Sequence, residues 1–199
     1  ENLLRLTRLD SGVEEDPVLV SFSPSVLRAV RMLNLVAKEK KVDLHCEILQ
    51  GGSVFANEEE VHQIVYNLTE NAIKYNNDHG YVKVTLDADH QFFTMEISDS
   101  GIGMPAEALD HIYERFYRVD KSHSREIGGT GLGLAISKQL VELMHGNLGV
   151  RSQYGMGSTF YFNLPQKVID ARCAARLKSE EEQKSVIGVK ITNSIVQQH

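Results

Sequence analysis

Apolar residues recur along this chain with two spacings, which predict helices and strands in a mixed order. A helical spacing of three to four residues runs through 24–40, 58–75 and 132–144, and a shorter helix is predicted at 105–116. Strands are predicted at 18–22, 42–49, 81–88, 91–98, 147–152 and 158–164. Because several strands are paired as hairpins between helices, we expect an α/β fold: a two-layer sandwich of one mixed sheet with helices packed on one face.

The two ends of the chain differ from this central part. Leu3, Leu6 and Leu9 form a narrow apolar stripe with no helical partner in the sequence, so residues 1–12 are predicted to be the end of a helical hairpin. The chain does not begin with Met, which suggests a piece of a longer protein. The main domain is expected over 13–165, and residues 166–199 are predicted to be a C-terminal tail of unknown role.

Composition narrows the function classes. The chain has 199 residues, of which 42% are hydrophobic and 24% charged, and its net charge is −6. An acidic chain without a Lys/Arg-rich run is a poor nucleic-acid binder, because phosphate neutralisation needs a basic face. The two cysteines form no metal-binding spacing, and a reducing compartment is the expectation. No apolar run approaches the roughly 18 residues of a membrane-spanning helix.

Two glycine clusters are the first candidates for chemistry. Residues 128–133 read Gly-Gly-Thr-Gly-Leu-Gly and enter a predicted helix, but they fit neither the dinucleotide-binding pattern nor the P-loop. Such a cluster either exposes backbone N–H groups to an anion or serves as a hinge, and the cluster alone favours neither. The second cluster follows Asp99 at the end of a predicted strand. It is either a ligand-facing loop or a common Asp-Ser-Gly turn.

A third candidate is a polar flank on the helix predicted at 58–75. Asn67, Asn71 and Lys74 are spaced i, i+4 and i+7, so they share one helical face. Such a stripe is more often a solvated surface than a binding site.

The order of these features resembles the ATP-binding domain of sensor histidine kinases, within the class that includes DNA gyrase, mismatch-repair and heat-shock chaperone ATPases. Residues 67–75 (NLTENAIKY) resemble the N box and 99–104 (DSGIGM) the first glycine box. Residues 114–120 (ERFYRVD) resemble the F box, 129–135 (GTGLGLA) the second glycine box, and 155–160 (GMGSTF) the closing strand motif. Five motifs in the family's order imply a Bergerat-type ATP-binding fold with ATP and Mg²⁺ as cofactors.

The resemblance implies specific roles. Asp99 would accept a hydrogen bond from the adenine amino group, Asn71 would be a ligand of Mg²⁺, and Lys74 and Arg118 would contact the phosphates. Asn67 stands where other members of the class carry a glutamate that activates water, and an amide cannot act as that base. The catalytic residues would be Asn67, Asn71 and Arg118.

The remaining implied contacts are with the nucleotide or its covering lid, over 104–129, which Phe116 would anchor. The implied ATP-binding residues besides those named are Tyr75, Gly101, Ile102, Gly103, Met104, Gly129, Thr130, Gly131, Leu132, Gly133, Leu134 and Thr159.

The family's phosphoacceptor histidine has no counterpart among the eight histidines of this sequence. The chain therefore resembles the catalytic half of a kinase that would phosphorylate a histidine on a separate dimerisation domain and, through it, a response regulator. The parent would be a bacterial, membrane-anchored homodimer with this domain in the cytoplasm. The alternatives are an ATPase or serine kinase of the same class, or a degenerate nucleotide-binding scaffold.

Overall fold

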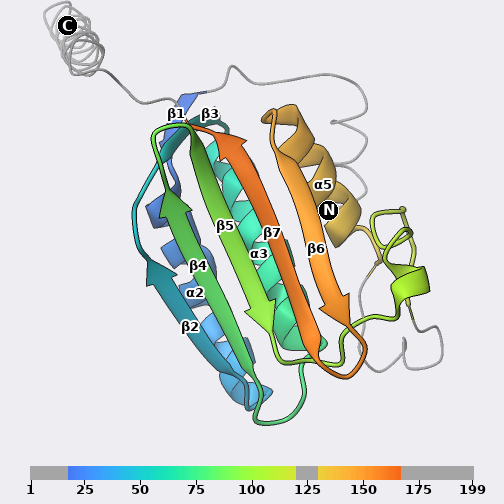
Figure 1. Cartoon of the computed structure of the whole chain (residues 1–199). Helices are drawn as coiled ribbons and strands as arrows, with labels where there is room; N and C mark the ends of the chain where they lie inside the picture. Colours follow the sequence, from blue (N-terminus) through green and yellow to red (C-terminus); the bar gives the residue numbers. More distant parts are fainter. Residues whose placement is uncertain (1–17, 120–129, 167–199) are drawn as a thin grey trace, which may run out of the picture. The chain divides into compact units, whose positions relative to one another are not determined.

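One five-stranded sheet organises the domain (Figure 1). The computed structural model describes residues 18–119 and 130–166, and every structural statement concerns these residues. The strand order is β2 (Asp43–Ile48), β4 (Tyr81–Ala88), β5 (Phe92–Asp99), β7 (Gly157–Pro165) and β6 (Asn147–Gln153). β2 and β4 are parallel and the other neighbours are antiparallel, so the sheet is mixed as predicted.

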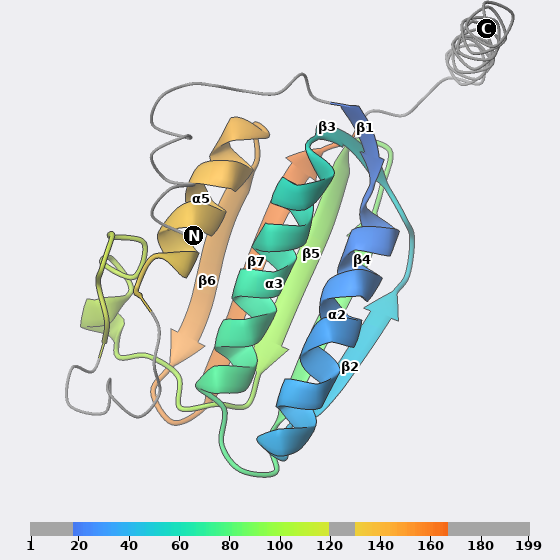
Figure 2. The ribbon, with the colours of Figure 1, turned by 180° about the vertical axis from the view of Figure 1, so that it is seen from behind.

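Three helices lie on one face of this sheet (Figure 2). They are α2 (Phe22–Glu39), α3 (Glu58–Lys74) and α5 (Gly133–Leu143), and α3 packs between the other two. This arrangement confirms the predicted two-layer α/β sandwich. No helix in the described part of the chain is long and apolar enough to cross a bilayer.

A short second sheet lies at the start of the domain. β1 (Val18–Ser21), which was predicted as a strand at 18–22, pairs antiparallel with β3 (Ser53–Ala56), which was not predicted. β3 has only four residues, between the glycine pair 51–52 and the Asn57 cap, which are too few to show the alternation of apolar and polar residues that is typical of a strand. The helix predicted over 1–12 lies outside the described residues, as does the predicted tail beyond residue 166.

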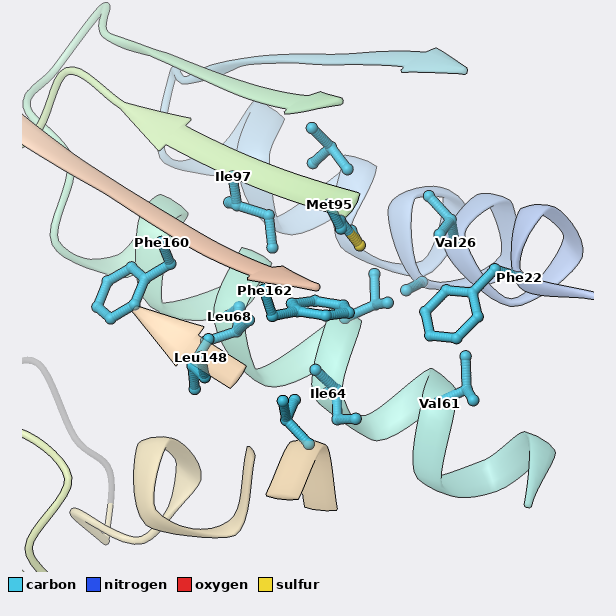
Figure 3. Packing of buried hydrophobic residues seen from close by; sticks show 14 of the residues in the cluster. Phe22, Val26, Val61, Ile64, Leu68, Met95, Ile97, Leu148, Phe160 and Phe162 are labelled. Atoms are coloured by element: carbon cyan, nitrogen blue, oxygen red, sulfur yellow. The ribbon is translucent and has the colours of Figure 1, made fainter. Parts of the chain in front are cut away.

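The core fills the space between the helices and the sheet (Figure 3). Alternate residues of the central strands point into it, and Phe93 and Phe162 are fully or almost fully buried. Phe22, from the first turn of α2, lies with its ring centroid 4.0 Å from that of Phe93. On α3, Ile64 and Leu68 meet the same core, so the helix has one apolar face toward the sheet and leaves another for polar side chains.

The start of α3 is specified locally. Asn57 accepts a hydrogen bond from the backbone N–H of Glu59 at 2.9 Å, which caps the helix. Glu58, Glu59 and Glu60 occupy the first turn and Lys74 the last, both favourable to the helix dipole. The predicted limits of this helix, 58–75, are therefore close to the observed ones.

The helix predicted at 105–116 is wrong. The segment contains a single 3₁₀ turn, η1 (Ala106–Ala108), followed by further turns with hydrogen bonds between residues three apart. Phe116 has a φ of 65°, a left-handed conformation that no α-helix contains. Its backbone N–H donates to the carbonyl oxygen of Gly131 at 3.0 Å, and not to a carbonyl of the preceding turn as in an α-helix.

Candidate active site

Asp99 closes β5, on the face of the sheet that the helices cover. Its Oδ1 accepts hydrogen bonds from the backbone N–H groups of Gly101 at 2.8 Å and Ser158 at 3.2 Å. Burial raises the pKa of Asp99 to about 6, against the lowering effect of these two bonds. Both bonds fall on Oδ1, so within the described residues Oδ2 remains able to accept from a ligand.

The glycines after Asp99 are required by close contacts between backbones. A Cβ on Gly101 would overlap the carbonyl oxygen of Tyr75, and one on Gly103, whose φ is 62°, would overlap that of Gln153. Ile102 donates its N–H to Tyr75 at 3.1 Å and accepts from Gly155 at 2.7 Å. The loop is therefore held between the end of α3 and the β6–β7 hairpin.

The polar flank of α3 is not uniformly solvated. Asn67 is only 8% exposed, and its Nδ2 donates to the carbonyl oxygen of Gly133 at 3.3 Å and to Ser137 Oγ at 3.4 Å. Asn71, one turn later, is half-buried, and its side-chain amide makes no hydrogen bond within the described residues. The buried amide joins α3 to the start of α5, while the second amide is available to a ligand.

Two cations from distant parts of the sequence approach each other at the end of α3. Partial burial lowers the pKa of Lys74; Glu70 opposes this effect, and the nearby positive charge of Arg118 adds to it. The Lys74 ammonium also lies 5.8 Å from the ring centroid of Tyr75, the residue whose carbonyl holds the glycine loop. An anion bound here would relieve the repulsion between Lys74 and Arg118.

The second glycine box meets the F box through the backbone. Gly131 has a φ of 69°, and a Cβ on it would lie 2.9 Å from the Cα of Phe116. The Phe116 side chain is 64% exposed, and its backbone N–H makes the contact with the second glycine box. The predicted lid over 104–129 is described only as far as residue 119, and Gly129 lies outside the described residues.

The other described residues of the two glycine boxes differ in burial. Met104 is half-buried and donates its N–H to Ser152 Oγ at 2.9 Å. Thr130 is exposed, Leu132 is buried, and Leu134 packs partly against the core.

The structure does not bring Thr159 to this site, which corrects the prediction. Thr159 pairs with Ser98, and their hydroxyls lie 2.9 Å apart on the sheet face opposite the helices. Ser158 points the other way, because successive side chains in a strand alternate. Its N–H contacts Asp99, and its hydroxyl lies 3.0 Å from that of Ser152. The burial of Phe160, Phe162 and Leu164 gives the same alternation, which was the signal available in the sequence.

The donor set suits a metal only in part. Within the described residues there is no group of three or more His, Cys, Asp or Glu side chains that could hold an ion. A hard cation bound at Asn71 would therefore take its other ligands from water and a phosphorylated ligand, as Mg²⁺ commonly does.

Comparison with known proteins agrees with this geometry. Residues 56–168 match the family described as "Histidine kinase-, DNA gyrase B-, and HSP90-like ATPase". The sensor histidine kinase RppB of Synechocystis is 38% identical over 167 residues, covering 82% of this chain and 37% of RppB. The structure of full-length ShkA in complex with AMPPNP has a TM-score of 0.72 at 27% identity, over 85% of this chain and 35% of that one. The mycobacterial sensor histidine kinase MprB has a TM-score of 0.68 at 25% identity, over 75% of this chain and 99% of the MprB chain.

The chain belongs to the family of histidine kinase-, DNA gyrase B- and HSP90-like ATPases. Its domain is the ATP-binding catalytic domain of the sensor histidine kinases, as in RppB and MprB. The resemblance drawn from the sequence is thereby confirmed. The chain spans 37% of the length of RppB and 28% of that of the Bacillus subtilis kinase WalK.

Proposed function

We propose that this domain binds Mg-ATP and transfers the γ-phosphoryl group to a histidine on a separate dimerisation domain. One observation carries the proposal: Lys74 and Arg118 lie close enough for their charges to interact, and Lys74 directly precedes the residue that holds the Asp99 loop. A cationic pair and a half-buried carboxylate are thus adjacent. The carboxylate suits the adenine end of an adenine nucleotide, and the cationic pair suits its phosphate end.

The proposed adenine contact uses Asp99. Its Oδ2 would accept from the exocyclic amino group, which guanine lacks at that position, so the site would prefer adenine. Gly101 and Gly103 let the backbone lie close to the base, and Tyr75, Ile102 and Met104 border it. This carboxylate is supported on its other oxygen by two backbone N–H groups, so its orientation is fixed before the ligand arrives.

The proposed phosphate contacts supply positive charge. Phosphoryl transfer depends chiefly on positioning and on offsetting charge at the γ-phosphoryl group, which Lys74 and Arg118 would provide. Asn71 would hold the Mg²⁺, which would supply further positive charge beside the phosphates. In the transfer, the bond between the γ-phosphorus and the bridging oxygen breaks, a bond to an imidazole nitrogen forms, and ADP leaves.

Asn67 disfavours the competing reaction with water. An amide has no basic group to take a proton, so we expect slow hydrolysis and preferential transfer to a histidine. The histidine would come from a dimerisation domain of the same parent protein and pass the phosphoryl group to a response regulator. We infer a bacterial, membrane-anchored homodimeric parent with this domain in the cytoplasm.

Calorimetric titration of the chain with AMPPNP, with and without Mg²⁺, tests the proposal. Binding should occur and should strengthen with Mg²⁺. Adding ATP and a dimerisation hairpin in trans should then give acid-labile phosphate on the hairpin. No binding to the folded chain contradicts the nucleotide assignment, and rapid phosphate release without the hairpin would favour an ATPase.

The Asn71 assignment has its own test. Asn71→Ala should reduce the strengthening of AMPPNP binding by Mg²⁺, because the ion loses its protein ligand. Asn163→Ala is a matched control: Asn163 is an exposed amide that accepts from the Asn147 N–H at 3.2 Å, on the opposite face of the sheet. Equal Mg²⁺ effects in the two variants would remove Asn71 from the metal site.

A further inference from the structure

Ser137 is a fully buried polar residue that the proposed site does not yet use. It lies on α5 one turn after Gly133, and both residues accept from the same Nδ2 of Asn67. The two acceptors therefore lie side by side on α5, facing one amide on α3. This contact between helices lies one turn before Asn71 along α3.

The two acceptors decide which way the Asn67 amide faces. The carbonyl oxygen of Gly133 can only accept, so the NH₂ group must be the end that meets α5. Turning the amide over would place its oxygen against the carbonyl oxygen of Gly133, and two acceptors repel each other. Oδ1 is thus directed away from both acceptors. It accepts no hydrogen bond from the described residues, yet it is not one of the buried atoms sealed from solvent.

We propose that Ser137 is a positioning residue that, together with the Gly133 carbonyl, fixes Asn67 so that its oxygen faces the bound nucleotide. The inference rests on the proposed function, since it needs a nucleotide beside α3. An amide oxygen repels a bare triphosphate and attracts the hydration shell of a cation. Ser137 therefore makes the site prefer nucleotide that carries a divalent cation over free nucleotide.

The Ser137→Ala variant tests this role. Alanine suits a buried helical position, so the variant should fold. With one acceptor lost, the amide is free to turn over in part of the molecules. We expect the ratio of AMPPNP affinities with and without Mg²⁺ to fall about fivefold, the effect of one hydrogen bond. Ser137→Thr keeps the hydroxyl acceptor, so its ratio should stay near that of the wild-type chain.

The chain offers a matched control in Ser25. This serine is 1% exposed on α2, and its hydroxyl has no hydrogen-bond partner within the described residues. Ser25→Ala should leave the Mg²⁺ ratio unchanged. If Ser137→Ala also leaves the ratio unchanged while wild-type chain binds, Ser137 only packs in the core and the inference is wrong.

A spectroscopic measurement separates this inference from the proposed function. The side-chain NH₂ resonances of Asn67, identified by their loss in Asn67→Asp, should shift in Ser137→Ala and not in Ser25→Ala, without any nucleotide present. Absence of that shift overturns the role of Ser137. Failure of wild-type chain to bind AMPPNP would count against the proposed function, and with it against the nucleotide-facing role of Asn67.

Discussion

At the scale of single residues, folding and binding make opposite demands on Asp99. Its carboxyl is partly removed from water, which favours the protonated form, while a ligand amino group needs an acceptor. The two backbone N–H groups on Oδ1 offset part of that cost. The site thus retains a carboxylate whose pKa lies near 6 rather than near 4.

The stability of the domain should depend on pH through Asp99. The pKa is about 6 in the folded state and 3.8 ordinarily, so the folded state binds this proton more tightly. The resulting stabilisation is complete below about pH 4 and is lost as the pH rises through 6. Relative to Asp99→Asn, wild-type chain should lose about 1–3 kcal/mol between pH 4 and pH 7. Denaturant unfolding across this range measures the difference, and a difference that does not vary with pH would contradict the raised pKa.

Two glycines of one hairpin allow a second test at this scale. Gly155 and Gly157 both have positive φ, 80° and 94°, but a Cβ on Gly157 would overlap the carbonyl oxygen of Asp99, while Gly155 has open space around it. Gly157→Ala should therefore lower the unfolding free energy more than Gly155→Ala and should weaken AMPPNP binding. Similar losses in the two variants would show that backbone strain alone matters here.

A candidate site could be proposed from the sequence because its motifs follow one another in a recognisable order along the chain. Asp99, Asn71 and Lys74 were predicted from spacing and resemblance together. Thr159 was assigned wrongly because the choice between adjacent strand residues depends on which face the strand buries. Ser137 was missed because its significance is a contact with a residue 70 positions away.

At the scale of elements, helix ends were predicted best where side chains specify them. α3 has its Asn57 cap and acidic first turn, and its observed limits agree with the prediction. The 105–116 segment contains apolar residues at suitable spacing, but its N–H groups are used in short turns and in the bond from Phe116 to Gly131. Local pattern cannot show a partner that far along the chain.

The end of α2 offers a stabilising substitution. Lys41, just after the helix, has a φ of 55°, which costs a side-chain-bearing residue about 1–2 kcal/mol. Lys41→Gly should raise the unfolding free energy by about 0.5–1 kcal/mol, after the greater flexibility of glycine in the unfolded chain is subtracted. Lys40, with φ −82°, is the control, and Lys40→Gly should not stabilise. A loss of stability in Lys41→Gly would show that the lysine side chain has a role of its own.

At the scale of the whole molecule, the fold was predictable because its layers follow from the order of elements. Hairpin-connected strands between helices favour one mixed sheet, and the apolar faces of the helices need a single surface to cover. Strand order was not predictable. The parallel pairing of β2 with β4 joins segments separated by β3 and α3, and no local feature indicates it.

Among the residues that the structure describes, the contacts that build the candidate site come from the stretch between Asn67 and Ser158. A fragment covering residues 13–165 should therefore fold and bind AMPPNP with the affinity of the full chain. Calorimetry on the fragment and the full chain compares the two. Weaker binding by a folded fragment would show that residues 1–12 or 166–199 contribute to the site.

Because backbone groups hold the Asp99 carboxylate, few side chains near it are fixed by that role during evolution. The two groups that hold its carboxylate are N–H donors of residues 101 and 158, which nearly every amino acid possesses. The side chain at 158 can therefore vary over generations without releasing the carboxylate, provided that it fits the space. Proline is the exception, because it has no N–H to donate.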